Sequence, residues 1–454
     1  MYKDLISARQ VLLRAVNSRL GRDSIGSMGL RISSTGLGFL STVLLARLLE
    51  PSGYGVYAYI YAWISILSVL TQFGLPTLVI RETAQGMAQN RPELVKGIWQ
   101  WTGRVTGLLS LALTVIGAVL AWLLRNSFGG ERLSTFAWAI LLVPLVALGN
   151  LRGAALRGLQ RVVAGQMPEF LIRPALLALF LLVAGVVFKH SLSAAEAMAL
   201  YVMAAALSFV IGAWMLWRIT PPEVRTAKPR IESRAWWLSA LPLAFIGGIG
   251  LFKKYASTII LGFFVVDSEI GIYRVATQLS IFASFGLEAV NFVVAPRIAA
   301  LYATRDMAKL QNVIIVSARI ILAMNVGITL TYILFGRIFL LLVFGSDYLE
   351  AYFPLLILLV GQTVNSSVGS VAVALNMTNY EQATVKVHTL SIILNVLLSF
   401  LLIPRLGMNG AAIAVTVSQI AWSALMWWEL RKHLGINSLA LSNFDWIKSK
   451  SRDG

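Results

Sequence analysis

Six basic side chains lie inside long apolar stretches of this sequence, where charged groups are rare. They are Arg104, Arg173, Lys253, Lys254, Arg274 and Arg319. Only two carboxylates, Glu169 and Glu288, lie at comparable depth. An unpaired charge at mid-membrane costs at least ~2.5 to 3.5 kcal/mol, so such groups face water, a counter-charge or a ligand. Because guanidinium and ammonium groups suit phosphate and pyrophosphate as donors, this excess of cations predicts a water-filled cavity that attracts an anion.

Other kinds of site chemistry are excluded by the residue types present. The chain has no cysteine, and its three histidines (His190, His388 and His433) lie too far apart for metal-ligand spacing. No Gly-Lys pair exists, so a Walker A phosphate loop is absent. Neither carboxylates at glycosidase spacing nor a histidine beside a nucleophile can be read from the sequence. We therefore expect no metal, no cofactor, no catalytic residues and no enzymatic activity.

The elements that position the cations must be membrane-spanning helices. Hydrophobic residues make up 58% of the chain and charged residues only 13%, whereas a soluble protein has about 25% charged residues. A helix of about 20 apolar residues crosses the hydrocarbon core. The sequence therefore predicts an all-α polytopic membrane protein with about twelve transmembrane helices. The expected spans are Gly29–Leu49, Gly55–Ile80, Ile98–Leu124, Leu133–Gly149, Phe170–Phe188, Ala194–Trp217, Leu238–Phe264, Ile270–Ala295, Val313–Phe335, Ala351–Asn376, Thr384–Ile403 and Asn409–Trp428.

An internal repeat divides the chain into two halves. At an offset of 216 residues, Pro51–Tyr57 aligns with Asp267–Tyr273. Because each half has six spans, both enter the membrane with the same polarity, so the repeats are parallel and a substrate site between them is expected. The predicted organisation is a basic interfacial segment (1–28), an N-terminal six-helix bundle (29–217), a cytoplasmic linker (218–237), a C-terminal six-helix bundle (238–431) and a cytoplasmic tail (432–454).

Lys and Arg residues are concentrated in alternate connections between the spans. The opposite connections contain only Arg47, Arg125, Arg132, Lys189, Arg337 and Arg405. Since cytoplasmic loops retain positive charge, this asymmetry predicts that both termini lie in the cytoplasm. The formal net charge of +18 then reflects topology and attraction to anionic phospholipids, in preference to nucleic-acid binding.

Polar residues follow one face of several predicted spans. In the second span, Tyr57, Tyr61, Ser65, Ser68 and Gln72 recur at helical spacing, and the offset places Thr277 and Glu288 on the eighth span, with Gln278 and Asn291 on nearly the same face. The tenth span carries Gln362 and Asn365. Such faces turn toward protein or water, so we expect them to line the cavity. A second interpretation is that they are hydrogen-bonding seams between helices.

Individual charged residues receive separate interpretations. We expect the cavity cations to be Lys254, Arg274, Lys253, Arg104, Arg319 and Arg31. Lys254 is preferred over Lys253 because it shares a face with Ser257 and Thr258, whereas Arg104 and Arg319 are also placed where they can extend to the interface. Glu169 and Arg173 are spaced to pair with each other. Glu288 is a candidate for ion coupling, or alternatively an ion-pair partner of Lys254.

The first hairpin resembles a known family. The run from Leu45 to Tyr57, followed by Phe73-Gly74-Leu75 and Ile80-Arg81-Glu82, is similar to the first hairpin of Wzx-type polysaccharide flippases of the MATE-like, or MOP, superfamily. The run from Leu156 to Arg161 after the fourth span is similar as well. The resemblance extends from about Gly29 to Arg431 through span count, halves and linker.

This resemblance implies transport and not catalysis. Family members move undecaprenyl-pyrophosphate-linked oligosaccharide repeats across the bacterial cytoplasmic (inner) membrane by alternating access, for lipopolysaccharide, capsule or exopolysaccharide. It implies a lipid-linked oligosaccharide as cargo, and polysaccharide polymerase and assembly proteins as partners. The alternatives are a MATE-type cation antiporter, which would favour carboxylates in the cavity, and a lipid II flippase, which usually has two further spans. A structural scaffold without transport activity would not need buried cations in both halves.

Overall fold

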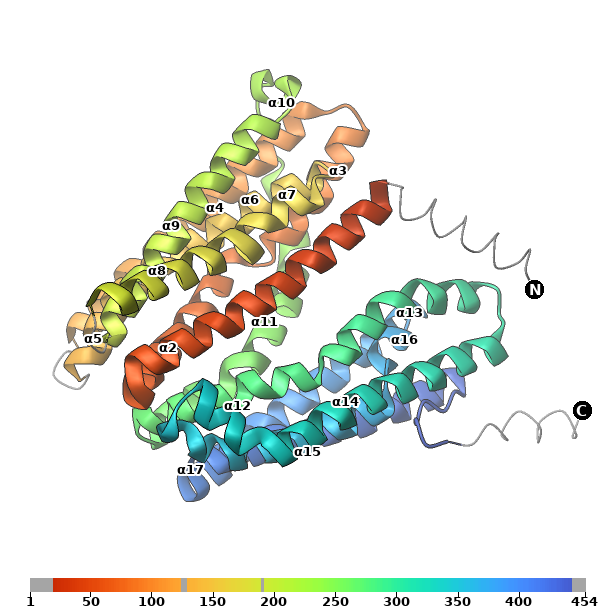
Figure 1. Cartoon of the computed structure of the whole chain (residues 1–454). Coiled ribbons are helices and arrows are strands. Elements are labelled where there is room, and N and C mark those ends of the chain that lie inside the picture. The colour runs from red at the N-terminus through yellow and green to blue at the C-terminus, as the bar shows by residue number, and fades with distance from the viewer. Residues whose placement is uncertain (1–18, 124–128, 189–191, 443–454) are drawn as a thin grey trace, which may run out of the picture. The chain divides into compact units, whose positions relative to one another are not determined.

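The computed structural model describes residues 19–123, 129–188 and 192–442, and within this part every regular element is a helix (Figure 1). The side chains of residues 19–25, 188, 242 and 245–254 are outside the description. The predicted interfacial segment 1–28 therefore lies mostly outside the described residues, as does the end of the predicted tail.

The chain forms two compact units. Unit 1 comprises Met1–Glu50 and Ile60–Leu251, and unit 2 comprises Pro51–Tyr59 and Phe252–Gly454. Unit 1 contains α2 (Arg19–Gln72) apart from residues 51–59, and the first part of α11 (Ser233–Phe264). Its other helices are α3 (Leu75–Ala88), α4 (Pro92–Leu123), α5 (Gly130–Ala139), α6 (Leu142–Gly158), α7 (Val162–Met167), the π-helix η1 (Pro168–Ile172), α8 (Arg173–Phe188), α9 (Ala194–Ile219) and α10 (Pro222–Thr226).

Unit 2 contains the rest of α11 and the short piece of α2 that follows Glu50. Its remaining helices are α12 (Asp267–Ala283), α13 (Phe285–Ala303), α14 (Met307–Val343), the 3₁₀-helix η2 (Ser346–Ala351), α15 (Tyr352–Val368), α16 (Val371–Met377) and α17 (Glu381–Leu434). The predicted bundle limits at 217 and 238 stay a prediction.

The helices account for the expected number of spans. Nine helical segments of the described chain are long and apolar enough to cross a membrane. Two of them, in α2 and α17, contain a non-helical residue, Glu50 or Gly407, and each of these helices covers two predicted spans. The span predicted at Leu238–Phe264 is supplied by α11. The count of about twelve is thereby confirmed.

Several predicted spans are broken helices. The second span is interrupted at Phe73 and Gly74, both with left-handed backbone angles, and the eighth is interrupted at Ser284. The tenth ends at Gly369 before a second helix begins. Buried irregular backbone is tolerated at membrane depth only where neighbouring protein or water satisfies it. These breaks therefore mark places where polar partners must be present.

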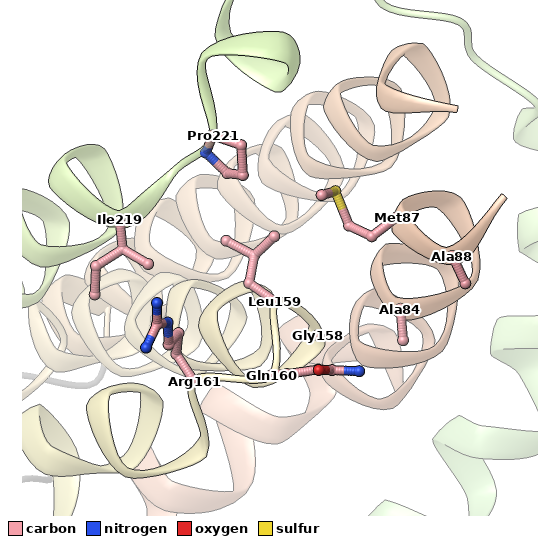
Figure 2. A pocket seen from close by; sticks show the side chains of 9 residues that line it. All are labelled: Ala84, Met87, Ala88, Gly158, Leu159, Gln160, Arg161, Ile219 and Pro221. Atoms are coloured by element: carbon pink, nitrogen blue, oxygen red, sulfur yellow. The ribbon is translucent and has the colours of Figure 1, made fainter. Parts of the chain in front are cut away.

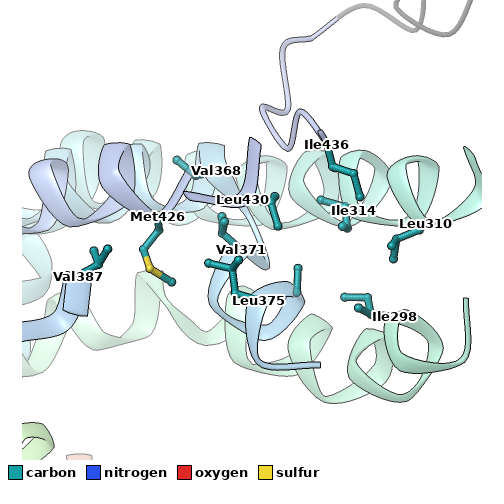
Figure 3. Close-up of a cluster of buried hydrophobic side chains, with 11 residues drawn as sticks. Ile298, Leu310, Ile314, Val368, Val371, Leu375, Val387, Met426, Leu430 and Ile436 are labelled. Atoms are coloured by element: carbon teal, nitrogen blue, oxygen red, sulfur yellow. The ribbon is translucent and has the colours of Figure 1, made fainter. Parts of the chain in front are cut away.

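A buried apolar cluster holds the helices of unit 2 together. Figure 3 shows Ile314 and Leu310 of α14 facing Leu375 of α16 and Leu430 of α17. Unit 1 has its own cluster, formed by α3, α4, α6 and α11, in which Trp101 packs against Trp236. Outside these clusters, α4 and α14 expose long rows of apolar side chains, as lipid-facing helices do.

Two glycines related by the sequence repeat make reciprocal contacts within unit 2. A Cβ atom on Gly55 would lie 1.7 Å from the carbonyl oxygen of Asp267, and one on Gly271 would lie 2.2 Å from the carbonyl oxygen of Pro51. The offset of 216 residues that relates Gly55 to Gly271 also relates Pro51 to Asp267. The repeat is thus expressed as a symmetric crossing of two backbones that only glycine allows.

We predict that Gly55→Ala lowers the thermal unfolding midpoint and the membrane yield of the protein, because the added methyl group overlaps a fixed carbonyl oxygen. Overpacking of this kind costs about 1–3 kcal/mol. The measurement is thermal unfolding of the purified protein in detergent. Gly36→Ala is the matched control, since a Cβ on Gly36 meets no atom within 4 Å. Equal midpoints for the two variants would contradict the prediction.

Candidate functional site

A buried charged cluster among the described residues of unit 1 combines two arginines and one glutamate. Glu169 accepts from the guanidinium of Arg152 at 3.0 Å and from that of Arg173 at 2.7 Å. The side chains of Arg152, Glu169 and Arg173 are 5%, 12% and 19% exposed. The expected pairing of Glu169 with Arg173 is thus confirmed, but it is part of a larger cluster. We call these three residues the Arg-Glu-Arg cluster.

The local backbone brings the cluster together. Glu169 lies in the π-helix η1, whose wider turn changes the direction in which side chains leave the helix, and such turns are frequent at functional sites. Ser208 of α9 donates to the carbonyl oxygen of Pro168 at 2.6 Å and fixes this turn. Gly212 of α9 lies directly against the Arg152 guanidinium, and Gly149 of α6 lies against the Glu169 carboxylate. Larger residues at either glycine would displace the charged groups.

Arg152 is held by more than its ion pair. Its Nη1 donates to the carbonyl oxygens of Ser208 and Phe209, and its guanidinium lies 5.5 Å from the centre of the Phe209 ring. Its Nε is buried without a partner among the described residues. The cluster contains two guanidinium groups and one carboxylate, so these three side chains together have a formal charge of +1. Such a charge favours a nearby anion.

Arg152 is not among the site residues predicted from the sequence. Its position near the end of the fourth predicted span suggested a cytoplasmic connection, whereas α6 continues through it to Gly158 and buries it. One signal was available in the sequence: Arg152 lies in a run of small residues, Gly149, Gly153, Ala154 and Ala155, which is typical of closely packed membrane helices.

A line of contacts connects this cluster to one of the predicted lining residues. The Arg173 guanidinium lies 5.9 Å from the Tyr201 ring, and the hydroxyl groups of Tyr201 and Tyr61 are 3.4 Å apart. Tyr57 belongs to unit 2, so the polar face of the second span is shared by both units. Ser68 and Gln72 are buried, and Asn150 donates to the Gln72 side chain at 2.9 Å. Gln72 therefore forms a hydrogen-bonding seam with α6.

A hollow of about 450 Å³ lies beside the Arg-Glu-Arg cluster, a volume in the range of small-molecule sites. Arg152 and Arg225 are its basic residues, and most of the remaining lining is apolar, including Trp99, Phe209 and Trp217. A second hollow of about 360 Å³ is lined by Met87 of α3 and by the turn after α6. Figure 2 shows the polar ends of Gln160 and Arg161 on one side of it.

The turn after α6 explains part of the sequence motif from Leu156 to Arg161. A Cβ on Gly158 would lie 2.5 Å from the Cβ of Thr83, so glycine permits the close approach of α6 and α3. Gln160 adopts a left-handed backbone conformation, and the indole of Trp99 donates to the Thr83 hydroxyl at 2.9 Å. The motif thus fixes a tight helix crossing beside the second hollow.

In unit 2 four of the predicted lining residues (Thr277, Gln278, Gln362 and Asn365) lie on α12 and α15, which pack against each other. Arg274, Thr277 and Gln278 are half-buried, and the Thr277 hydroxyl donates to the carbonyl oxygen of Arg274. Asn365 is buried. Gln362 accepts from the Gln419 amide of α17 at 3.1 Å, so it forms a seam between helices.

Asn325 of α14 organises the break in the eighth span, and the sequence analysis did not single it out. It is 1% exposed and donates to the carbonyl oxygen of Ala283, where α12 ends, at 3.0 Å. Its side-chain oxygen accepts from the Thr363 hydroxyl of α15 at 2.9 Å. Similarly, the Ser257 hydroxyl donates to Asn395 of α17. These contacts support the interpretation of some polar faces as seams.

The remaining predicted charges are placed as follows. Arg31 and Arg104 are exposed, and Glu288 is exposed in the first turn of α13. Asn291, one turn further along, is half-buried, and its side-chain oxygen is buried without a partner among the described residues. The side chains of Lys253 and Lys254 lie outside the described part of the structure.

Arg319 is exposed, and it donates to main-chain carbonyl oxygens of the segment that follows α17.

The amino-acid sequence of this chain is similar to known sequences. A family described as polysaccharide biosynthesis proteins matches residues 20–302. The chain belongs to this family. It is 24% identical over 405 residues to the probable low-salt glycan biosynthesis flippase Agl15 of Haloferax volcanii, covering 88% of this chain and 81% of that protein.

Solved structures show the same fold. An inward-facing multidrug resistance MATE transporter of the MOP superfamily has a TM-score of 0.74 at 12% identity, covering 91% of this chain and 98% of that one. The lipid II flippase MurJ in an inward closed conformation has a TM-score of 0.68 at 12% identity, covering 90% and 87%. This polysaccharide biosynthesis family protein therefore has the MATE-like fold, which confirms the resemblance. The chain is a multi-pass membrane protein. The relative and the structural neighbours named here are flippases or transporters and not enzymes.

We predict that Glu169→Gln destabilises the protein strongly, because it leaves two buried guanidinium groups without a carboxylate. Removing one partner of a buried ion pair costs about 3–5 kcal/mol. Thermal unfolding in detergent measures the effect. Glu82→Gln is the control, since Glu82 pairs with Arg81 at the same 3.0 Å but near the surface, where such pairs contribute ~0–1 kcal/mol. A variant at Glu169 as stable as the control would show that the cluster does not hold unit 1 together.

Proposed function

We propose that this protein transports lipid-linked oligosaccharide repeat units, carried on undecaprenyl pyrophosphate, across the cytoplasmic membrane by alternating access. The glycan would serve a cell-surface polysaccharide such as lipopolysaccharide or exopolysaccharide. Membership of the polysaccharide biosynthesis family supports a glycan precursor as cargo, and the MATE-like fold supports a transport mechanism. The flippase Agl15 named above supports the same class of activity.

The observation that carries the proposal is the net positive charge of the Arg-Glu-Arg cluster in the interior of unit 1. Guanidinium groups bind phosphate oxygens in a bidentate manner and remain charged at any physiological pH. A carrier of organic cations would need the opposite balance, with carboxylates in excess. The pyrophosphate that joins glycan to lipid is the anionic part of the proposed cargo, while the prenyl chain stays in the lipid.

The other predicted cations extend this positive environment in the proposal. Lys254, Lys253, Arg274, Arg104, Arg319 and Arg31 would contact the pyrophosphate or acidic sugars at different stages of transport. Half-buried Gln278, Thr277 and Tyr61 would form hydrogen bonds with sugar hydroxyl groups, with the Thr277 hydroxyl as an acceptor. No bond is broken in this process, so the chain needs to supply only binding and a change of access.

The charge asymmetry of the connections supports an orientation with both termini in the cytoplasm of a bacterial cell, where anionic phospholipids attract the basic loops. A polysaccharide polymerase and assembly proteins would receive the cargo on the other side. These partners follow from the proposed pathway.

Reconstitution into liposomes tests the proposal. We expect the wild-type protein to expose a fluorescent undecaprenyl-pyrophosphate oligosaccharide to an external glycosidase at least about tenfold faster than protein-free liposomes, a factor equivalent to ~1.4 kcal/mol. We expect Arg173→Gln to lose most of this activity, since it removes the excess charge and leaves the Arg152–Glu169 pair in place. Arg405→Gln, at an exposed position on α17, is the control and should transport normally.

Three results would reject the proposal in different directions. Transport of lipid II in preference to the oligosaccharide would favour the lipid II flippase. Export of organic cations instead would favour an antiporter. Absence of any transport by folded protein would favour a structural role.

We also predict that Glu288→Gln lowers transport and removes its dependence on a proton or sodium gradient. The carboxylate lies in the first turn of α13, directly after the break at Ser284, and it is open to solvent there. Transport rates with and without an imposed gradient measure the effect. Asp347→Asn provides a control at an exposed carboxylate on η2. Unchanged gradient dependence in the Glu288 variant would exclude a coupling role for this residue.

A further inference from the structure

A short segment after α17 folds back onto unit 2. Helix α17 ends at Gly435, which adopts a left-handed conformation, and the chain then reverses direction. We call residues 436–442 the strap. Ile436 is 2% exposed and lies in the apolar cluster beside Ile314 of α14 (Figure 3). The root of the strap is therefore anchored in the core.

Hydrogen bonds fix the middle of the strap. The indole of Trp427 donates to the Asn437 side chain at 3.0 Å, and Ser438 is completely buried. The main-chain N–H of Ala440 donates to the carbonyl oxygen of Ser367, near the end of α15, at 3.0 Å. Ala440 is 5% exposed, whereas the next residue, Leu441, is 85% exposed. The buried part of the strap thus ends at Ala440.

The last residues of the strap contact Arg319, which the sequence analysis predicts as a cation of the transport cavity. Arg319 of α14 donates from Nε to the carbonyl oxygen of Ala440 and from Nη2 to that of Ser442, both at 3.0 Å. Nε and Nη2 form one edge of the planar guanidinium, with two parallel donors that match the two oxygens of a carboxylate or phosphate. The strap presents two carbonyl oxygens in the same arrangement.

The two carbonyl oxygens of the strap accept the hydrogen bonds of the Arg319 guanidinium but do not neutralise its positive charge. A carbonyl carries only a partial negative charge, whereas a pyrophosphate carries full negative charges and makes stronger hydrogen bonds to an arginine. Displacing the strap would cost only the contacts of its outer part, because Ile436 and Ser438 hold its root independently. An anion can therefore compete for Arg319 without unfolding unit 2.

We propose that the strap is an autoinhibitory contact that occupies the anion-binding edge of Arg319 and is displaced by a pyrophosphate group. The identification of that group as part of a lipid-linked cargo rests on the proposed function, but the competition between strap and anion does not. Release of residues 439–442 would free Arg319 for binding, and return of the strap would favour release of the anion.

Thiol labelling tests whether the strap moves. The protein has no cysteine, so Ala440→Cys introduces a single reporter at a buried position. We expect this thiol to react with a maleimide about tenfold more slowly than the thiol of Leu441→Cys, a ratio equivalent to ~1.4 kcal/mol. Inorganic pyrophosphate or an isoprenyl pyrophosphate should raise the rate of Ala440→Cys. Vesicles of phosphatidylglycerol form a separate arm that distinguishes a phospholipid headgroup from pyrophosphate.

Two further variants make the labelling result decisive. Adding Arg319→Gln to Ala440→Cys should give fast labelling that no longer depends on pyrophosphate, because the strap has lost its partner and the anion its binding edge. Labelling of Ala440→Cys that is unaffected by both pyrophosphate and Arg319→Gln would overturn the proposal. Acceleration by phosphatidylglycerol alone would overturn the assignment of pyrophosphate as the displacing group.

Binding affinity provides an independent measurement. Ala440→Pro removes the N–H that donates to Ser367, so the strap should compete less well, and inorganic pyrophosphate should bind about fivefold tighter by calorimetry, equivalent to ~1 kcal/mol. Ala440→Gly keeps the N–H and is the matched control. Equal affinities for Ala440→Pro and the wild type would contradict autoinhibition. Neither measurement requires oligosaccharide transport, so a failure of the proposed function remains distinguishable from a failure of the strap mechanism.

Discussion

A polar group that this chain buries among apolar helices is costly unless it finds a partner inside the protein, and this constraint accounts for much of the structure. A buried polar group without a hydrogen bond costs several kcal/mol, and a buried charge costs more. The Arg-Glu-Arg cluster and the Asn325 contacts at the break in the eighth span are two solutions to this problem, and the strap gives the exposed Arg319 partners of a third kind. They use a counter-charge, a side-chain amide and main-chain carbonyls, respectively. The solutions differ in reversibility: the first is locked by surrounding glycines, whereas the last involves a segment in which Leu441 is 85% exposed.

Much of the fold could be predicted from the sequence because its main determinant is hydropathy. Runs of apolar residues located the spans, and the offset of the repeat aligned Gly55 with Gly271, the two glycines that meet in the structure. The breaks within the predicted helices were harder to predict from the sequence. Pro144 and Pro354 both lie in the first turn of a helix, where proline is tolerated because that N–H has no helical partner. The interruption of the eighth span at Ser284 depends on Asn325, which is 41 residues away, so no local pattern could reveal it.

The candidate site was only partly predictable for a similar reason. Periodicity identifies the face on which a residue lies, but not what that face meets. Gln72 and Gln362 were expected to line a cavity, and each has an amide partner on a neighbouring helix, a contact that its helical periodicity does not reveal. Arg152 was assigned to a connection because the predicted fourth span ends before the end of α6. The ion pair that holds the Arg152 side chain involves Glu169 in the π-helix η1, and no pattern in the sequence predicts a π-helix there. Charge counting was nevertheless informative, since the excess of arginine over glutamate persists in the cluster that forms.

The reciprocal glycine contact has a consequence for how the two halves have diverged. Because Gly55 and Gly271 meet carbonyl oxygens, the contact involves main chain only, and it places no demand on the side chains of Pro51 and Asp267. A proline in one copy and an aspartate in the other preserve the same crossing. After duplication, the side chains around this crossing could therefore change as long as the two glycines were kept. The electrostatic character of each half could change with them. Asymmetry between the copies thus accumulated without loss of the scaffold that relates them.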